Sequence, residues 1–318
     1  MNAKACWIKY YRRNWIRTKY KAVLGKLHIN HSISPTYKDR LIPIEKAHNA
    51  IRKIIERGQP ALVARFGSNE AWCTAMCIGK QLQATDEIGD AILKGIYNNA
   101  GVFPYGEEMA MRFSEISVES AKQVDILGAW NSFMQDYLID NVCSPQMQCT
   151  SLGNLEPYNS QKPWTSALKG KKVLVIHPFK DTIEAQYKKR ELLFEDSDIL
   201  PEFQLTVLRA VQTIAGEQDD RFSTWDEALE YMHKQAMKID FDVAIIGCGA
   251  YGMPLGARLK ESGKIVIHLG GATQLLFGIK GGRWDNHPLS RLYNEHWVRP
   301  LQSETPKAAK KVENACYW

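Results

Sequence analysis

Three glycines that follow a short apolar segment give this sequence its clearest chemical signal. Val243–Ile246 has the composition of a buried strand in a parallel sheet. Directly after it come Gly247, Gly249 and Gly252, then a helical pattern and a second apolar segment at residues 264–269. Glycine lets the backbone approach a ligand closely, and the N-terminus of a helix stabilises an anion. We therefore expect this β-loop-α-β unit to bind the phosphates of a nucleotide or nucleotide-sugar.

The same glycine spacing occurs in NAD-binding folds, which need one further residue. Those folds place an acidic side chain at the end of the second strand, where it binds the ribose hydroxyl groups. Here the second strand ends in His268 and is followed by Gly270 and Gly271, with no carboxylate. An NAD(P)-dependent oxidoreductase that uses the Gly247–Gly252 loop stays an alternative, as does a tight turn that binds no ligand.

A second polar turn occurs early in the chain. Ala61–Phe66 predicts a short strand, and Gly67, Ser68, Asn69 and Glu70 open the helix that follows. Arg65 lies within the otherwise apolar strand, so its guanidinium must find an anion or a carboxylate. Glu70 is suited either to binding chemistry or simply to a favourable charge in the first turn of a helix.

Further turns carry polar residues of the same kind. Lys171–Pro178 predicts a buried strand that ends in His177 and feeds a loop with Lys180, which suits an anionic ligand. Asn98 lies in a polar loop bounded by glycine and proline. After residue 269, a second glycine-rich turn contains Gly270, Gly271, Thr273 and Gln274.

Alternation of strands and helices from Ala61 to Leu276 predicts the fold class. It indicates an α/β protein with a Rossmann-like, doubly wound and mostly parallel sheet that has helices on both faces. We expect residues 1–44 to form a basic, aromatic N-terminal helix and linker, and residues 45–318 to form one Rossmann-like domain. The carboxyl ends of parallel strands share one edge, where the polar turns would meet.

Basic charge is concentrated at the N-terminus. The first 30 residues hold eight Lys and Arg and no acidic residue, which leaves 33 basic and 35 acidic residues in the rest of the chain. We therefore expect no nucleic-acid partner. Trp7, Tyr11 and Trp15 share one face of a predicted helix. That helix either lies in a membrane interface, with its cations against anionic lipid, or packs on the body.

Cysteine spacing and hydropathy limit which other classes of protein the sequence is compatible with. The seven cysteines form no Cys-x-x-Cys pair, so no zinc spacing is present. We find no signal peptide and no apolar run long enough to cross a membrane. These features predict a cytoplasmic protein, with the N-terminal helix placing it at the inner face of the cell membrane.

Four motifs together resemble the GT-D-fold glycosyltransferases, which are bacterial enzymes of surface-glycan and glycoprotein assembly. The motifs are Arg65-Phe-Gly-x-x-Glu70, Ile176-His-Pro178, Ile246-Gly-Cys-Gly-Ala-Tyr-Gly252 and His268-Leu-Gly-Gly-Ala-Thr-Gln-Leu-Leu-Phe-Gly-Ile-Lys-Gly281. The resemblance runs from about residue 45 to the C-terminus. It implies transfer of a sugar from a nucleotide-sugar donor, expected to be a UDP-sugar, to a glycan or lipid-linked acceptor in surface-polysaccharide assembly.

The first motif departs from the family pattern at one position. Members that resemble this chain carry Asp-x-Glu there, which holds a divalent metal on the donor diphosphate, whereas this chain has Ser68 in place of the Asp. A hydroxyl is a weak ligand for Mn²⁺ or Mg²⁺, so Glu70 is the one metal ligand that the motif retains. A divalent metal cofactor is therefore possible but not required by the sequence.

Roles follow from this comparison and from the chemistry of sugar transfer. A departing nucleoside diphosphate needs cations or helix N-termini, and an acceptor hydroxyl needs a proton acceptor. Glu70 and His177 are the catalytic candidates. A non-catalytic nucleotide-sugar-binding protein of a glycan locus stays the second alternative. The residues expected to bind the donor are Arg65, Gly67, Ser68, Asn69, Asn98, Lys180, Gly247, Gly249, Tyr251, Gly252, His268, Gly270, Gly271, Thr273 and Gln274.

Overall fold

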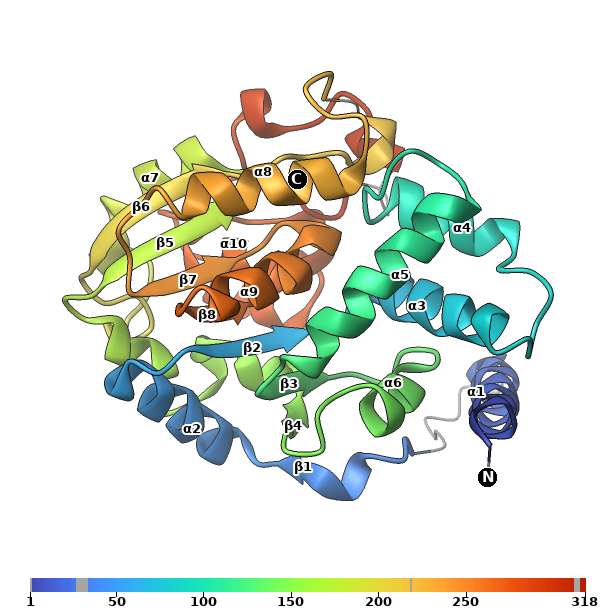
Figure 1. Cartoon of the computed structure of the whole chain (residues 1–318). Helices are drawn as coiled ribbons and strands as arrows, with labels where there is room; N and C mark the ends of the chain where they lie inside the picture. Colours follow the sequence, from blue (N-terminus) through green and yellow to red (C-terminus); the bar gives the residue numbers. More distant parts are fainter. Residues whose placement is uncertain (1, 27–33, 218, 312–314) are drawn as a thin grey trace.

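Eight parallel strands form the single sheet of this protein (Figure 1), in a computed structural model that describes residues 2–26, 34–217, 219–311 and 315–318. Their order across the sheet is β1-β4-β3-β2-β8-β7-β5-β6. Every pair of neighbours is parallel, so all strands end at the same edge. The strands are β1 (Leu41–Ile42), β2 (Ala61–Arg65), β3 (Ile126–Ala129), β4 (Gln148–Ser151), β5 (Lys172–His177), β6 (Gln204–Arg209), β7 (Val243–Ile246) and β8 (Ile265–His268).

Apolar side chains fill both faces of the sheet. In β7, Val243 and Ile245 belong to the hydrophobic cluster on one face, while Ala244 and Ile246 belong to the cluster on the other. Because successive residues of a strand point to opposite faces, a strand buried on both sides must be apolar throughout. This explains why the central strands have no polar alternation.

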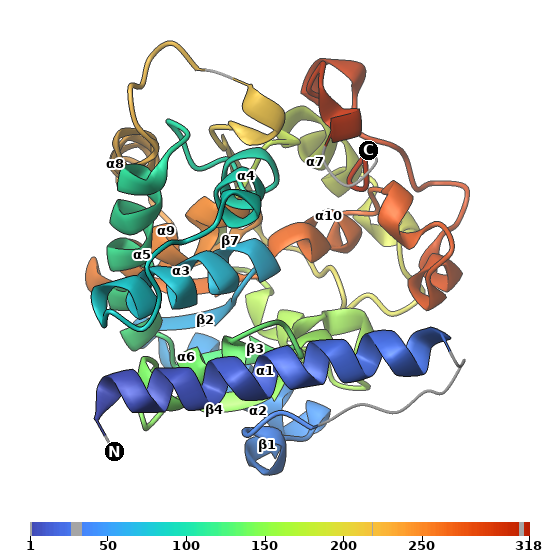
Figure 2. The same cartoon turned by 90° about the vertical axis from the view of Figure 1, so that its right-hand side faces the viewer.

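Nine of the ten α-helices of the described residues cover these two faces, and α1 lies against α3 and α6 (Figures 1 and 2). One face packs against α3, α5, α8 and α9, with α4 and α6 beside α3, and the other packs against α2, α7 and α10. The helices are α1 (Ala3–Lys26), α2 (Ile44–Arg57), α3 (Ser68–Gln81), α4 (Asp90–Asn98), α5 (Glu107–Lys122), α6 (Gln135–Asn141), α7 (Lys180–Tyr187), α8 (Trp225–Ala236), α9 (Gly252–Glu261) and α10 (Thr273–Leu276).

The predicted fold class is confirmed. The structure differs from the sequence-based prediction only in single elements. Helix α6 was not predicted, since Gln135 and Asp136 interrupt its apolar pattern yet both are fully buried. Strand β1 was also missed, because two residues are too short for any periodicity. The linker predicted before residue 44 lies partly outside the described residues.

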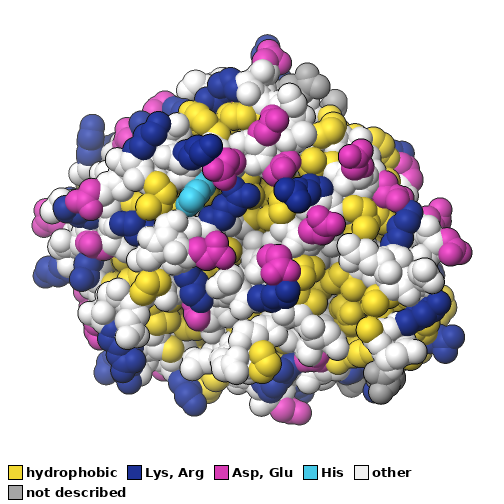
Figure 3. All heavy atoms as spheres, in the orientation of Figure 1, with side chains coloured by type: hydrophobic (Ala, Val, Ile, Leu, Met, Phe, Trp, Pro, Cys, Tyr) yellow, Lys and Arg dark blue, Asp and Glu magenta, His cyan; other side chains and the backbone are white. Residues whose placement is uncertain are grey.

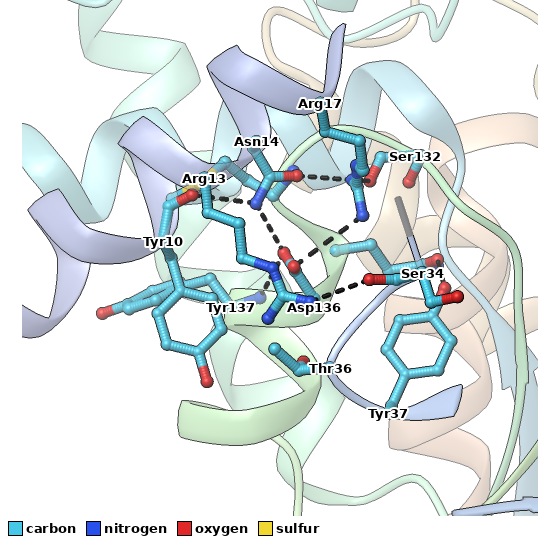
Figure 4. A network of polar contacts seen from close by, with 12 residues as sticks. Tyr10, Arg13, Asn14, Arg17, Ser34, Thr36, Tyr37, Ser132, Asp136 and Tyr137 are labelled. Atoms are coloured by element: carbon cyan, nitrogen blue, oxygen red, sulfur yellow. Dashed lines mark hydrogen bonds and ion pairs between the residues drawn. The ribbon is translucent and has the colours of Figure 1, made fainter. Parts of the chain in front are cut away.

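Helix α1 packs on the body through one face (Figure 4). The Trp7 ring is buried and its indole N–H donates to the carbonyl of Ala75 at 2.7 Å. Asn14 is fully buried, and its amide donates to the Asp136 carboxylate at 2.8 Å. The Arg17 guanidinium, also buried, lies 3.8 Å from that carboxylate. A charge this deeply buried is stable only when it is paired, so this network fixes how α1 lies on the body.

The opposite face of α1 points away from the body and mixes apolar with basic side chains. Trp15, Ile16 and Val23 are more than half exposed, and Tyr20 is 39% exposed. Lys9, Arg12 and Lys19 lie on the same exposed side. Figure 2 shows α1 as a long helix along the outside of the molecule. The two sequence-based alternatives for this segment are therefore not exclusive, since one face packs and the other is open.

Elsewhere the visible surface has no single sign of charge. On the face drawn in Figure 3, Lys and Arg side chains are interspersed with Asp and Glu. Within the described residues, no helix is long and apolar enough to span a membrane.

Candidate functional site

A cavity of about 440 Å³ opens at the carboxyl ends of the central strands. Gly67 follows β2, His177 ends β5, Gly249 follows β7 and Gly271 follows β8, and all four residues line this one cavity. Ligand pockets commonly enclose roughly 300–1,000 Å³, so the space suits a nucleotide-sugar. The turns that the sequence marked separately thus meet at one place in the fold.

Most of the predicted site residues lie in the wall of this cavity, and four do not. Thr273 is fully buried, and its hydroxyl donates to the carbonyl of Ile246 at 3.3 Å. Gly252 lies under the His268 ring, which leaves no room for a side chain at that position. Asn98 is outside the wall, but its neighbour Asn99 is part of it. The predicted residues that line the cavity are Arg65, Gly67, Ser68, Asn69, Glu70, His177, Gly247, Gly249, Tyr251, His268, Gly270, Gly271 and Gln274.

Lys180 is the fourth predicted residue outside the wall. Its ammonium group lies 3.8 Å from Glu184, one turn further along α7. The first amide groups of α7 are also taken, because the buried Glu304 carboxylate accepts from the N–H of Asp181 at 2.6 Å and of Thr182 at 3.3 Å. The N-terminus of α7 therefore binds a carboxylate of this chain, where we expected it to face the donor.

Glu70 is the one acidic side chain among the described residues that line the cavity. It lies in the first turn of α3, and its carboxylate folds back over Gly67, where a Cβ atom would collide with it. Gly67 has an ordinary extended backbone, so its lack of a side chain is what matters here. The helix begins at this glycine, and the residues of its start, Gly67 to Glu70, lie in the cavity wall.

Arg65 contributes positive charge to the opposite side of the same turn. Its guanidinium donates to the carbonyl of Phe66 at 3.2 Å and lies over the Trp130 ring at 5.7 Å. Burial raises the pKa of Glu156 to about 7, and the nearby Arg65 opposes that rise. Glu156, which the sequence did not single out, therefore lies within electrostatic range of Arg65, while the guanidinium donates to the backbone carbonyl of Phe66.

The hydrogen bonds of His177 define its protonation state. The N–H of Phe179 donates to Nδ1 at 3.0 Å, so the ring proton is on Nε2. Burial lowers the pKa of His177 to about 3, which keeps the ring neutral at physiological pH. A neutral ring with its lone pair already used is a hydrogen-bond donor. Glu70 is therefore better placed than His177 to accept a proton.

His268 has the opposite arrangement. Its Nδ1 lies 3.2 Å from the carbonyl oxygen of Ile246, which can only accept, so Nδ1 carries the proton and Nε2 the lone pair. Burial, assisted by the nearby positive charge of Arg65, lowers the pKa of His268 to about 3. Neutral His177 thus donates through Nε2, and neutral His268 accepts through Nε2. The two residues end β5 and β8, the strands that flank β7.

Several wall residues were not predicted. Trp130 follows β3, and residues 211–214 follow β6, where Thr213 donates to the carbonyl of Gly101 at 2.6 Å. Tyr317 and Trp318 come from the C-terminal segment. Nothing in the local sequence of these residues marks a ligand site. Only the position of residues 211–214 after a predicted strand could have drawn attention to them.

The donor atoms at the cavity determine what kind of metal ion these residues could hold. Among the described residues no group of three or more His, Cys, Asp or Glu is arranged to hold an ion. Glu70, with Ser68 beside it, supplies one carboxylate at the cavity. Mg²⁺ is often held by one or two carboxylates together with substrate phosphates and water. The residues therefore fit an ion that enters with the phosphates of a ligand.

The chain is similar to proteins of one known fold family. A model of the GT-D fold-like domain matches residues 43–276. Two solved structures are similar at 14% identity and a TM-score of 0.42, covering 83% of this chain and 92% of theirs. One is a selenomethionine-substituted structure of domain of unknown function 1792, and the other is described as showing that this highly conserved domain has a distinct glycosyltransferase fold. No curated protein matches the chain.

The two buried histidines predict a pH dependence of stability. In the unfolded chain a histidine has a pKa near 6.5, whereas both pKa values here are about 3. A lowered pKa in the folded state contributes stability that is present above pH 6.5 and is lost as the pH falls toward 3. We expect His268 to account for about 2 kcal/mol of the decrease in unfolding free energy between pH 7.5 and pH 5.

Urea denaturation at both pH values measures this contribution. The decrease should be smaller by about 2 kcal/mol in His268→Gln than in the wild type. His296→Gln, at a partly exposed histidine outside the cavity, serves as the matched control and should keep the wild-type decrease. The same decrease in all three proteins would contradict the assignment.

Proposed function

The chain belongs to the family of GT-D fold-like domains, and from this premise we propose that it is a glycosyltransferase that moves a sugar from a nucleotide-sugar donor to an acceptor hydroxyl. One observation carries the proposal most directly: the turns after β2, β5, β7 and β8 line a single cavity with one carboxylate. Sugar transfer requires such a site, because a phosphate leaving group and a proton acceptor must lie close to one anomeric carbon.

One residue of the cavity accepts the acceptor's proton, and others stabilise the leaving phosphate group. The acceptor oxygen forms a bond to the anomeric carbon of the sugar while the bond from that carbon to the donor phosphate breaks. Glu70 takes the proton of the acceptor hydroxyl. The nucleoside diphosphate leaves with negative charge, which Arg65, Arg283 and the N–H groups at the start of α3 stabilise.

His177 and His268 orient the donor in this scheme. Their rings are neutral and nearly fully buried, one donating and the other accepting through Nε2. Such a pair can discriminate hydroxyl groups of a sugar or ribose without adding charge. The β8 end carries His268 where a dinucleotide site would have a carboxylate, and no observation favours an oxidoreductase.

The donor is proposed to be a UDP-sugar and the acceptor a glycan or lipid-linked glycan of a bacterial surface polysaccharide. A divalent ion, if it is used, would be held by Glu70 and supply positive charge to the donor phosphates. Ser68 stands where the resembled pattern has Asp. The ion would therefore be held mainly by the phosphates of the donor, with Glu70 as its one carboxylate ligand from the motif.

A thermal-shift panel tests donor binding and metal use together. A ligand that binds only the folded state raises the melting temperature, so UDP-sugars should raise it and the effect should grow with Mn²⁺. Mn²⁺ alone should produce no shift in the wild type. Ser68→Asp, which adds a second carboxylate, should increase the Mn²⁺-dependent part. If no member of a UDP-, GDP-, ADP- and CDP-linked sugar panel shifts the wild type, the proposed function is wrong.

Two substitutions test Glu70 as the proton acceptor. Glu70→Gln should lower transfer by at least about 100-fold while the protein stays folded, since general bases contribute roughly 10²–10⁴-fold. Gly67→Ala should also lower transfer, because the new methyl group displaces the carboxylate, which is the flexible end of its side chain. Gly153→Ala, where an added Cβ meets only an ordinary contact and the backbone is not left-handed, controls for changing a glycine outside the cavity wall. Wild-type turnover in Glu70→Gln would exclude Glu70 from the reaction.

Helix α1 supports a location at the cytoplasmic face of a membrane. Its exposed face combines Trp15, Ile16, Tyr20 and Val23 with cations, which suits an anionic bilayer surface. The packed face contacts the loop that follows the cavity-lining Trp130, because Arg17 donates to the carbonyl of Ser132 at 3.0 Å. A lipid-linked acceptor would therefore be held beside the cavity.

Vesicle sedimentation tests this location without removing the helix. Deletion of α1 would uncover the Trp7 site, so the outward residues are changed instead. Ile16→Glu with Val23→Glu should weaken binding to phosphatidylglycerol vesicles by about tenfold or more, because two apolar contacts are lost and two acidic charges are added. Leu192→Glu, at a residue that is equally exposed elsewhere, should bind as the wild type does. Equal binding by all three proteins would assign α1 a packing role alone.

A further inference from the structure

The chain after Leu276 lies outside the segment matched by the family model, yet it returns to the cavity. Arg283, Tyr317 and Trp318 line the wall beside the Gly270-Gly271 turn. Figure 1 shows this C-terminal segment, in red, at the end of the sheet where the strands terminate. The family-matched domain is therefore not the whole of the site in this chain.

Several contacts hold the C-terminal segment in place. Glu304, at 4% exposure, is bound to the first amides of α7 and to the Thr182 hydroxyl. Further along, the Arg283 N–H donates to the carbonyl of Cys316 at 2.8 Å, and the Gln274 amide donates to the carbonyl of Tyr317 at 3.1 Å. A segment fixed by buried polar contacts at both points is a structural part of the wall.

The side chains that this segment brings to the cavity form a stacked pair. The Arg283 guanidinium lies over the Tyr317 ring at 4.7 Å from its centroid. The edge of that ring lies against Gly271, where an added Cβ would come within 2.5 Å of a ring carbon. Tyr317 is only partly buried, so part of its ring faces the cavity. A flat aromatic surface and a cation thus occur side by side at one end of the site.

We propose that Tyr317 and Arg283 form the binding site for the nucleoside diphosphate part of the donor. The planar base stacks on the Tyr317 ring, and the guanidinium of Arg283 meets the charge of the phosphates. Bases stack on aromatic rings, and arginine binds phosphate through several N–H groups. An uncharged acceptor sugar would use the ring but would have no anion for Arg283. This assignment rests on the proposed function and adds a nucleotide-recognition site from outside the family-matched region.

Titration calorimetry with UDP, uridine and inorganic pyrophosphate separates the two contributions. Tyr317→Ala should weaken UDP and uridine by about tenfold and leave pyrophosphate unchanged, since loss of one base stack costs roughly that much. Arg283→Ala should weaken UDP and pyrophosphate but not uridine. Tyr317→Phe keeps the ring and should bind as the wild type does. If GDP, ADP or CDP proves to be the better ligand, it and its nucleoside replace UDP and uridine.

A second substitution tests base stacking on Tyr317 without truncating that side chain. Gly271→Ala, which pushes the ring aside, should reproduce the UDP and uridine effect of Tyr317→Ala. Arg299→Ala is the matched control, because this arginine pairs with Asp285 at 2.6 Å and lies outside the cavity wall. Melting temperatures near the wild-type value show that the variants are folded.

The outcomes distinguish this inference from the proposed function. Failure of the wild type to bind any nucleotide counts against the glycosyltransferase itself. Binding by the wild type with equal affinity in Tyr317→Ala overturns only the role of Tyr317. Unchanged nucleotide affinity with a raised KM for the acceptor assigns the pair to the acceptor and likewise overturns the inference.

Discussion

Burial of a fully parallel sheet on both faces is the constraint on which the rest of this structure depends. Strands that run in one direction end at one edge, and helices on both sides leave that edge as the main place where polar turns can emerge. In the sheet order, β2 and β8 are neighbours although about 200 residues separate them in the chain. The first and last motifs therefore meet at the centre of the sheet, next to β7 and its glycine turn.

This constraint explains which parts of the site the sequence could predict. Gly67, His177, Gly249 and Gly271 each follow a recognisable apolar strand, and parallel strands place such residues together without further information. Lys180 follows a strand equally well, but its helix start is occupied by Glu304, which lies more than 120 residues further along the chain. No local pattern announces that contact. The same holds for Tyr317, whose position depends on where the C-terminal segment folds back.

Helix α6 shows the other limit of sequence-based prediction. Its buried Asp136 is paired with Asn14 and Arg17 of α1, so the residues that make this buried acid tolerable lie more than 100 positions earlier in the chain. The network also holds the loop before α6, since Asn14 accepts from the N–H of Met134 at 2.9 Å. Trp130 precedes that loop and lines the cavity. The buried ion pair thus links α1 to one wall of the site by contiguous contacts.

Charge balance in the cavity bears on how Glu70 can act. With both histidines neutral, the charged side chains in the described wall are Arg65, Arg283 and Glu70, a net side-chain charge of +1 for the diphosphate of the proposed donor. A carboxylate and a diphosphate repel each other at close range in a partly desolvated site. Glu70 is therefore compatible with the donor in two arrangements. Either a divalent ion lies between them, or the carboxylate faces the acceptor side of the sugar and the phosphates lie toward Arg283. The second arrangement needs no Asp at position 68, which agrees with the serine found there.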